Sequence, residues 1–173
     1  TTGSYNSAFG VHALRCNLTG SYNTASGYRA LYNSTAGCNT AVGTLALFSN
    51  TTGNRNTAVG GDTLKCNTTG SQNTAMGFNA LALSTYGAGN TASGYRALVQ
   101  NTSGGYNVAI GRQSMDCSTV GVGNVAVGNN SNYSNTSGSC NAFIGSHAGF
   151  ANTTGSCNTA LGNYAALCHA TNS

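Results

Sequence analysis

The segment NTAVGGDTLKCNTTGSQ, residues 56–72, decides the fold because the chain repeats it from end to end. Ten segments share the opening pattern Asn-x-(Ala/Phe)-x-Gly at a spacing of 17 residues, shortened to 16 between Asn23 and Asn39. We place the missing residue after Gly37. The idealised unit is N-T-A-V-G-x-x-A-L-x-x-N-T-T-G-x-x, whose positions we number one to seventeen, and a fixed period of this kind is typical of stacked repeats. The opening residues are Asn6, Asn23, Asn39, Asn56, Asn73, Asn90, Asn107, Asn124, Asn141 and Asn158.

Glycine recurs at positions five and fifteen of the units. Fixed glycines indicate corners with positive φ or very close approach of two chain segments. Two corners in each unit leave straight segments of about three to five residues, which suit strands and not helices. The repeat therefore predicts an all-β fold, a single-path β-solenoid or β-roll of ten 17-residue coils, with residues 1–173 as one domain without visible caps.

The remaining regular columns predict the interior of the coil. Position four is apolar in eight units and position nine is Leu or Met in seven, and we expect these two columns to form the core. We also expect the opening Asn residues to form a ladder in which each amide bonds to the same group in the coils above and below. At the strand spacing of about 4.8 Å, ten coils make a rod of roughly 48 Å.

The repeat resembles those of known fibrous proteins. The NTAVG-type units are similar to repeats of tail-fibre-like proteins that lie upstream of an endosialidase-type chaperone domain. Residues 107–111 (NVAIG) and 124–128 (NVAVG) resemble, more distantly, the head repeats of YadA-type trimeric autotransporter adhesins. The resemblance implies a β-roll or β-solenoid in a surface fibre or adhesin, with a trimer as one form of assembly.

The composition argues against catalysis. Acid–base catalysis uses paired acids or an acid beside a histidine, and the chain has only Asp62 and Asp116, three coils apart. Calcium needs several oxygen ligands, so we expect no metal and no cofactor. The six basic residues form no run that would attract nucleic acid, and no apolar stretch is long enough to span a membrane. We expect a non-enzymatic protein.

The cysteines occupy two columns. Cys140 and Cys157 hold the same position in adjacent coils, about 5 Å apart, so we expect a disulfide between them. Cys16 and Cys168 lie in the first and last coils, and an intermolecular disulfide between them would lock a head-to-tail joint. The alternative is that they are small apolar residues. The sequence leaves the pairing of Cys38, Cys66 and Cys117 open.

Position twelve repeatedly begins an Asn-x-Ser/Thr sequon, whereas the opening Asn residues never do. We expect the sequon column to be exposed and, in a secretory context, glycosylated. The alternative is that Asn and Thr recur there as turn residues. The candidates are Asn17, Asn33, Asn50, Asn67, Asn101, Asn135 and Asn152.

These features predict a structural subunit of an extracellular filament or fibre shaft, at a cell or virion surface. Because no charged or helical cap is visible, we expect coils to stack end to end into a homopolymer, with a homotrimer as the competing assembly. An adhesin or tail-fibre segment that binds host surface glycans is the first alternative. An ice-binding solenoid is the second, although its Thr column at position two is interrupted at Val108, Val125 and Ala142.

Overall fold

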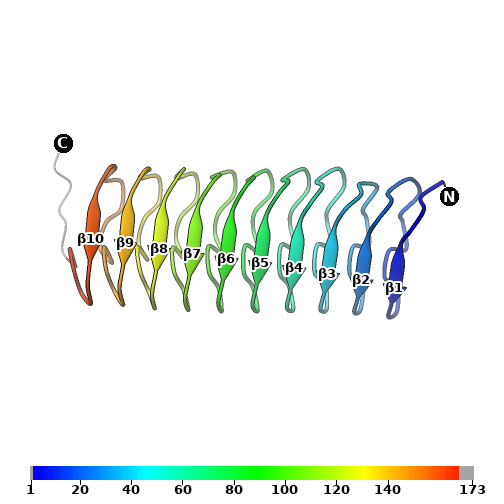
Figure 1. Ribbon diagram of the computed structural model, residues 1–173, viewed down its shortest axis with the longest axis horizontal. Helices are drawn as coiled ribbons and strands as arrows, with labels where there is room; N and C mark the ends of the chain where they lie inside the picture. The colour runs from blue at the N-terminus through cyan, green and yellow to red at the C-terminus, as the bar shows by residue number, and fades with distance from the viewer. Residues whose placement is uncertain (1, 168–173) are drawn as a thin grey trace.

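The computed structural model describes residues 2–167, which form a straight β-solenoid rod with one short strand in each coil (Figure 1). Every strand covers positions two to four of its unit, and β1 and β10 lie at opposite ends of the rod. The remaining positions form turns, so each coil has one strand and not two straight segments. The strands are β1 (Ser7–Phe9), β2 (Thr24–Ser26), β3 (Thr40–Val42), β4 (Thr57–Val59), β5 (Thr74–Met76), β6 (Thr91–Ser93), β7 (Val108–Ile110), β8 (Val125–Val127), β9 (Ala142–Ile144) and β10 (Thr159–Leu161).

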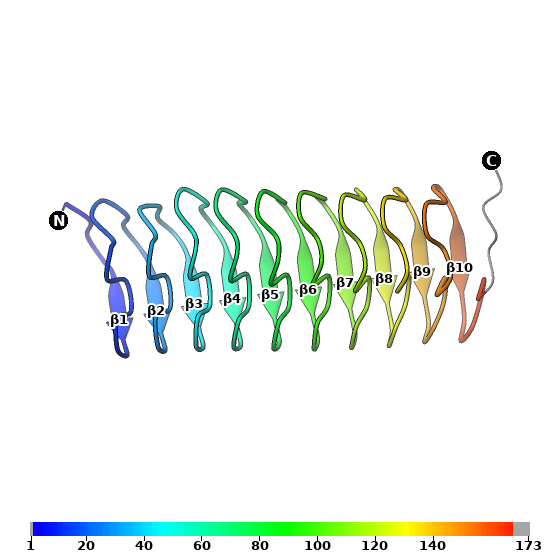
Figure 2. The same ribbon diagram turned by 180° about the vertical axis from the view of Figure 1, so that it is seen from behind.

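The ten strands form one parallel sheet in chain order, β1 to β10. Each residue pairs with the residue at the same position of the next unit, as Thr57 pairs with Thr74, so one coil is one 17-residue lap. Backbone hydrogen bonds also join neighbouring coils outside the strands, for example from Leu64 N–H to Ala80 O at 3.1 Å. Figure 2 shows the same lap-on-lap stacking from behind. The predicted all-β solenoid with 17-residue coils is confirmed.

The core lies at positions three, eight and nine, so the sequence prediction was half wrong. Position nine is buried as predicted, from Leu31 to Met115. Position four points outward instead, since Val42 and Ile110 remain 39% and 41% exposed. Successive strand residues point to opposite faces, and the small Ala at position three takes the inward one. The fully buried alanines at positions three and eight include Ala41, Ala46, Ala58, Ala75, Ala80, Ala92, Ala97 and Ala109.

One coil exchanges its large and small core residues. In the ninth unit Phe143 replaces the usual Ala at position three, and Gly149 replaces the usual Leu at position nine. Phe143 is fully buried, and a Cβ added to Gly149 would lie 2.6–2.7 Å from three of its ring atoms. The ring therefore fills the space that a Leu side chain fills in the other coils.

The short second unit loses its residue earlier than the sequence predicted. Thr35 N–H donates to Thr51 O at 3.0 Å, so the two coils are still in phase at position thirteen. Asn23 Nδ2 then donates to Ala36 O at 2.9 Å, whereas Asn39 and Asn56 donate to the glycine carbonyl at position fifteen of their units. Ala36 thus occupies position fifteen, and the omitted residue lies between Thr35 and Ala36, not after Gly37.

The two glycine columns serve different physical needs. Position five has φ between 121° and 136°, a region that L side chains avoid. Position fifteen is required by close packing, since a Cβ on Gly70 would lie 2.3 Å from Gly87 O in the next coil. Positions seven, nine and seventeen are left-handed as well, although most of their residues carry side chains.

Candidate functional surface

The opening asparagines form a hydrogen-bonded ladder along the rod. Asn73 Oδ1 accepts the backbone N–H of Asn90 at 2.9 Å, and Asn73 Nδ2 donates to Gly87 O at 2.8 Å. The side chains in the interior coils are buried. The ladder therefore differs in detail from the expected one, because it mainly joins each amide to the backbone, with longer amide-to-amide bonds of 3.1–3.2 Å beside it.

The sequon column at position twelve points inward, which contradicts its expected exposure. Asn50, Asn67, Asn101 and Asn135 are fully buried and Asn152 is 3% exposed. Their Nδ2 groups donate to the glycine carbonyl three residues ahead at 2.9–3.1 Å. A glycan on such a nitrogen would replace one of its hydrogens inside the coil. The expected glycan row therefore has no room here, and only Asn17 and the out-of-register Asn33 are partly exposed.

The predicted disulfide between Cys140 and Cys157 is absent, because both are free, exposed thiols. In-register stacking places equivalent Cβ atoms about 4.8 Å apart with parallel directions. A disulfide needs Cβ atoms at about 3.5–4.5 Å, so its formation would require the two coils to approach each other at this corner. For the proposed intermolecular pair, Cys16 is exposed in the first coil and Cys168 lies outside the described residues.

Positions seven and ten form a chemically varied strip along the rod, which we call the seam. Six of the eight charged residues of the chain lie in these two columns, and the two columns touch in several coils. Lys65 Nζ lies 3.0 Å from Asp62 Oδ1, and the rings of His147 and Phe150 are 5.5 Å apart. The invariant columns build the coil, so the seam is where the units differ most in charge and aromatic character.

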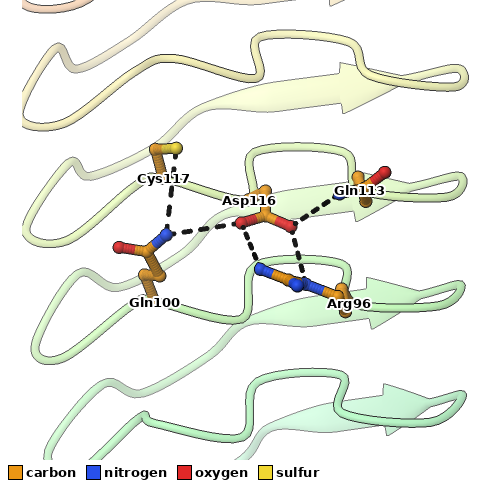
Figure 3. A network of polar contacts seen from close by, with 5 residues as sticks. All are labelled: Arg96, Gln100, Gln113, Asp116 and Cys117. Carbon is orange, nitrogen blue, oxygen red and sulfur yellow. Dashed lines mark hydrogen bonds and ion pairs between the residues drawn. The ribbon is translucent and has the colours of Figure 1, made fainter.

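The centre of the seam holds a polar network around Asp116, whose side chain is fully buried (Figure 3). Arg96, one coil away, donates to the carboxylate through Nε at 3.1 Å and through a terminal nitrogen at 3.2 Å. Gln100 and Gln113 each donate to it at 3.4 Å. These bonds hold Asp116 against three neighbours and raise the pKa of Arg96.

The Asp116 network is not equipped for nucleophilic chemistry. Burial raises the pKa of the adjacent Cys117 thiol, and the Asp116 carboxylate raises it further. Burial likewise raises the pKa of Tyr133. A thiol with a raised pKa stays protonated at neutral pH, and the thiolate is the reactive form. Within residues 2–167, no three His, Cys, Asp or Glu side chains lie close enough to share a metal ion.

The first three coils carry a cluster of cations and rings in and beside the seam, which we call the basic-aromatic patch. Tyr32 lies at its centre: the Arg15 and Arg29 guanidinium carbons lie 5.9 and 5.7 Å from its ring centroid. The ring also contacts His12 and Phe48, with centroids 6.3 and 5.4 Å apart. The patch consists of His12, Arg15, Tyr28, Arg29, Tyr32 and Phe48.

The outer face of the sheet displays positions two and four side by side. Thr24, Thr40, Thr57, Thr74 and Thr91 occupy five consecutive strands in register. Beside them runs the apolar column that includes Val42, Val59 and Met76. In β7, β8 and β9 the Thr column changes to Val108, Val125 and Ala142.

The two end coils expose surface that the interior coils bury. Ala8 at position three is exposed and Ala160 is half-buried, whereas the alanines at this position in β2 to β8 are buried. Phe9 and Leu161 at position four are 80% and 77% exposed, about twice the value in the interior. No helix in the described part of the chain could cross a membrane.

Comparison with models of known protein families, with curated proteins and with solved structures found no match to this chain. The function is therefore inferred from the geometry of the rod. Sequence reasoning identified the repeat columns but missed the seam and its patch. The available signal was the recurrence of charged and aromatic residues at positions seven and ten, which is visible once the units are aligned.

Proposed function

We propose that the chain is the non-catalytic shaft of an extracellular or virion-surface fibre, and that it lengthens by end-to-end stacking of coils. The observation that carries the proposal is the in-register parallel stacking of equivalent units, because the bonds that join one coil to the next can also join coils of two copies. The resemblance of the repeat to tail-fibre-like proteins supports the same function.

The hydrogen-bonding groups at the two ends match. Within the described residues, Asn158 Oδ1 accepts no hydrogen bond, and Asn6 N–H donates none. In every interior pair these two groups bond to each other at 2.9–3.0 Å. The tenth coil of one copy can therefore receive the first coil of the next copy in the geometry that already joins its own coils. Unpaired strand edges favour such addition.

Burial at the joint adds to the hydrogen bonds. Stacking covers Ala8, which the isolated rod exposes, and Ala160, which it half-buries, together with part of the exposed Phe9 and Leu161. Removal of apolar surface from water contributes about 25 cal/mol per Å².

Electron microscopy of purified protein tests the proposal. We expect filaments much longer than the roughly 48 Å of ten coils, with an axial repeat near 4.8 Å in fibre diffraction. Ala160→Asp places a carboxylate in the joint and should abolish filaments. Thr159→Asp changes the neighbouring, outward residue and should preserve them. Rods of single length for the unmodified chain at high concentration, with an intact circular dichroism spectrum, would contradict end-to-end stacking.

A second candidate function, ice binding, is favoured by the outer face of the sheet. Five consecutive threonines in register, flanked by an apolar column, form a regular array with the strand spacing of about 4.8 Å. An ice-recrystallisation assay tests this candidate. Thr57→Lys should remove the inhibition of ice recrystallisation, and Thr52→Lys, on an exposed turn, should leave it unchanged. If the unmodified chain does not inhibit recrystallisation, ice binding is excluded.

A further inference from the structure

The basic-aromatic patch holds two cations that have no acidic partner. The chain has only two acids, and both already have cationic partners elsewhere in the seam: Asp62 pairs with Lys65 and Asp116 with Arg96. Arg15 donates instead to the Tyr32 hydroxyl at 3.3 Å, and Arg29 Nε is buried without a hydrogen-bond acceptor in the described structure. The positive charge of the first two coils is therefore not neutralised.

The aromatic rings position these cations. Arg29 lies 5.1 Å from the Tyr28 ring centroid and 5.7 Å from that of Tyr32. Cation–π contacts of this kind contribute about 0.5–1 kcal/mol at exposed sites and restrict the guanidinium. Arg15 contacts the same Tyr32 ring from the first coil, so both guanidinium groups converge on one area of the surface. Two restrained guanidinium groups can recognise carboxylates and tetrahedral oxyanions through paired N–H donors.

We propose that the basic-aromatic patch is a binding site for an acidic polysaccharide, with Arg15 and Arg29 as the groups that bind its sulfate or carboxylate substituents. The half-exposed Tyr28 ring offers an apolar surface beside them for a sugar ring. A polymer with regularly spaced anions suits a site with two cations on adjacent coils. The Tyr32 ring is already covered by the two Arg side chains and Phe48, so it is not free to stack on a nucleic-acid base.

Isothermal titration calorimetry with four probes tests the site: heparin for sulfates, polygalacturonate for carboxylates, neutral dextran, and oligothymidylate. We expect saturable, salt-sensitive binding of heparin or polygalacturonate, and the stronger of the two identifies the preferred anion. Arg15→Gln combined with Arg29→Gln should weaken this binding about tenfold, because two charge-assisted hydrogen bonds are lost. Tyr32→Leu should weaken it less, because the charges remain and only their positioning is lost.

The matched control is Arg112→Gln, which removes an exposed charge that makes no cation–π contact within residues 2–167 and should change affinity less than about twofold. Thermal melting establishes that each variant is folded. The site would be overturned if Arg112→Gln lost as much affinity for the acidic polymer as the double Arg variant. It would also be overturned if dextran bound as tightly as the acidic polymers, if oligothymidylate bound more tightly, or if neither acidic polymer showed saturable binding. The inference does not depend on filament formation, so either proposal can fail alone.

Discussion

Individual core residues in this rod are constrained by the side chains that share their coil. The exchange of Phe143 and Gly149 illustrates this dependence, because a large side chain at position three is tolerated only where position nine lacks one. Gly149 has φ 63°, close to the 50–55° of the leucines at position nine, so its backbone would accept Leu. The constraint on the pair is therefore one of volume.

A double-mutant cycle tests this volume exchange. Phe143→Ala leaves a cavity and should lower the free energy of unfolding by about 3–5 kcal/mol. Gly149→Leu should destabilise by overpacking against the ring. Together the two changes recreate the common unit, and the combined cost should be smaller than that of Phe143→Ala alone. Chemical denaturation of the four proteins measures the coupling, and simple additivity of the two costs would contradict it.

The buried carboxylate of Asp116 should contribute more to stability than its exposed counterpart. Asp116→Asn weakens the bonds from Arg96, Gln100 and Gln113 and should cost about 1–3 kcal/mol. Asp62→Asn is the matched control: the Asp62–Lys65 pair is partly exposed, so its loss should cost less than about 0.5 kcal/mol. Urea denaturation measures both, and equal costs would show that burial of Asp116 has no energetic consequence.

At the scale of the single coil, the turns and not the strand determine the shape. Each strand has only three residues, and the left-handed residues at positions seven, nine and seventeen turn the chain around the core. A left-handed conformation costs an L residue about 1–2 kcal/mol. The coil adopts this left-handed conformation because hydrogen bonds to the neighbouring coils hold these positions. One example is the bond from Gln72 N–H to Asn54 O at 3.0 Å.

A glycine at one of these corners should relieve the cost. Gln72 has φ 61° and an exposed side chain, and the units with Gly89 and Gly123 already have glycine at this position. Gln72→Gly should raise the free energy of unfolding by about 0.5 kcal/mol, since relief of strain exceeds the entropic cost of glycine. Gln72→Val should lower it by about 1 kcal/mol, because β-branched residues avoid this region. Thermal melting distinguishes the two, and a lower melting temperature for the glycine variant would contradict the strain argument.

At the scale of the whole molecule, stability is a sum over neighbouring coils. Each strand contacts only the strands before and after it, as in other solenoids. Among the described residues, no strand packs against one beyond its immediate neighbours, so nothing compensates for a coil that loses its register. The repeat length is therefore constrained more strongly than the number of repeats.

Deletion of residues 57–73 tests this constraint because it removes one complete lap and joins Asn56 to Thr74. The shortened chain should retain its β-sheet circular dichroism and melt cooperatively at a slightly lower temperature. Deletion of residues 57–64 removes about half a lap and should abolish the cooperative transition. If both deletions melted alike, the stacked-lap description would be wrong.

The sequence alone determined the lap length, the stacking axis and the inward Asn and Leu columns, because a period of 17 residues places equal positions over one another whatever the path of the lap. Only the tertiary structure decided which side of the strand faces inward. The larger apolar residues at position four favoured that side in the sequence, but the small Ala at position three is the residue that faces the core. The tertiary structure also decided that the sequon column is buried and that positions seven and ten meet in a seam. Those outcomes depend on left-handed corners at residues such as Leu64 and Asp62, where the backbone conformation comes from bonds to adjacent coils and not from local propensity.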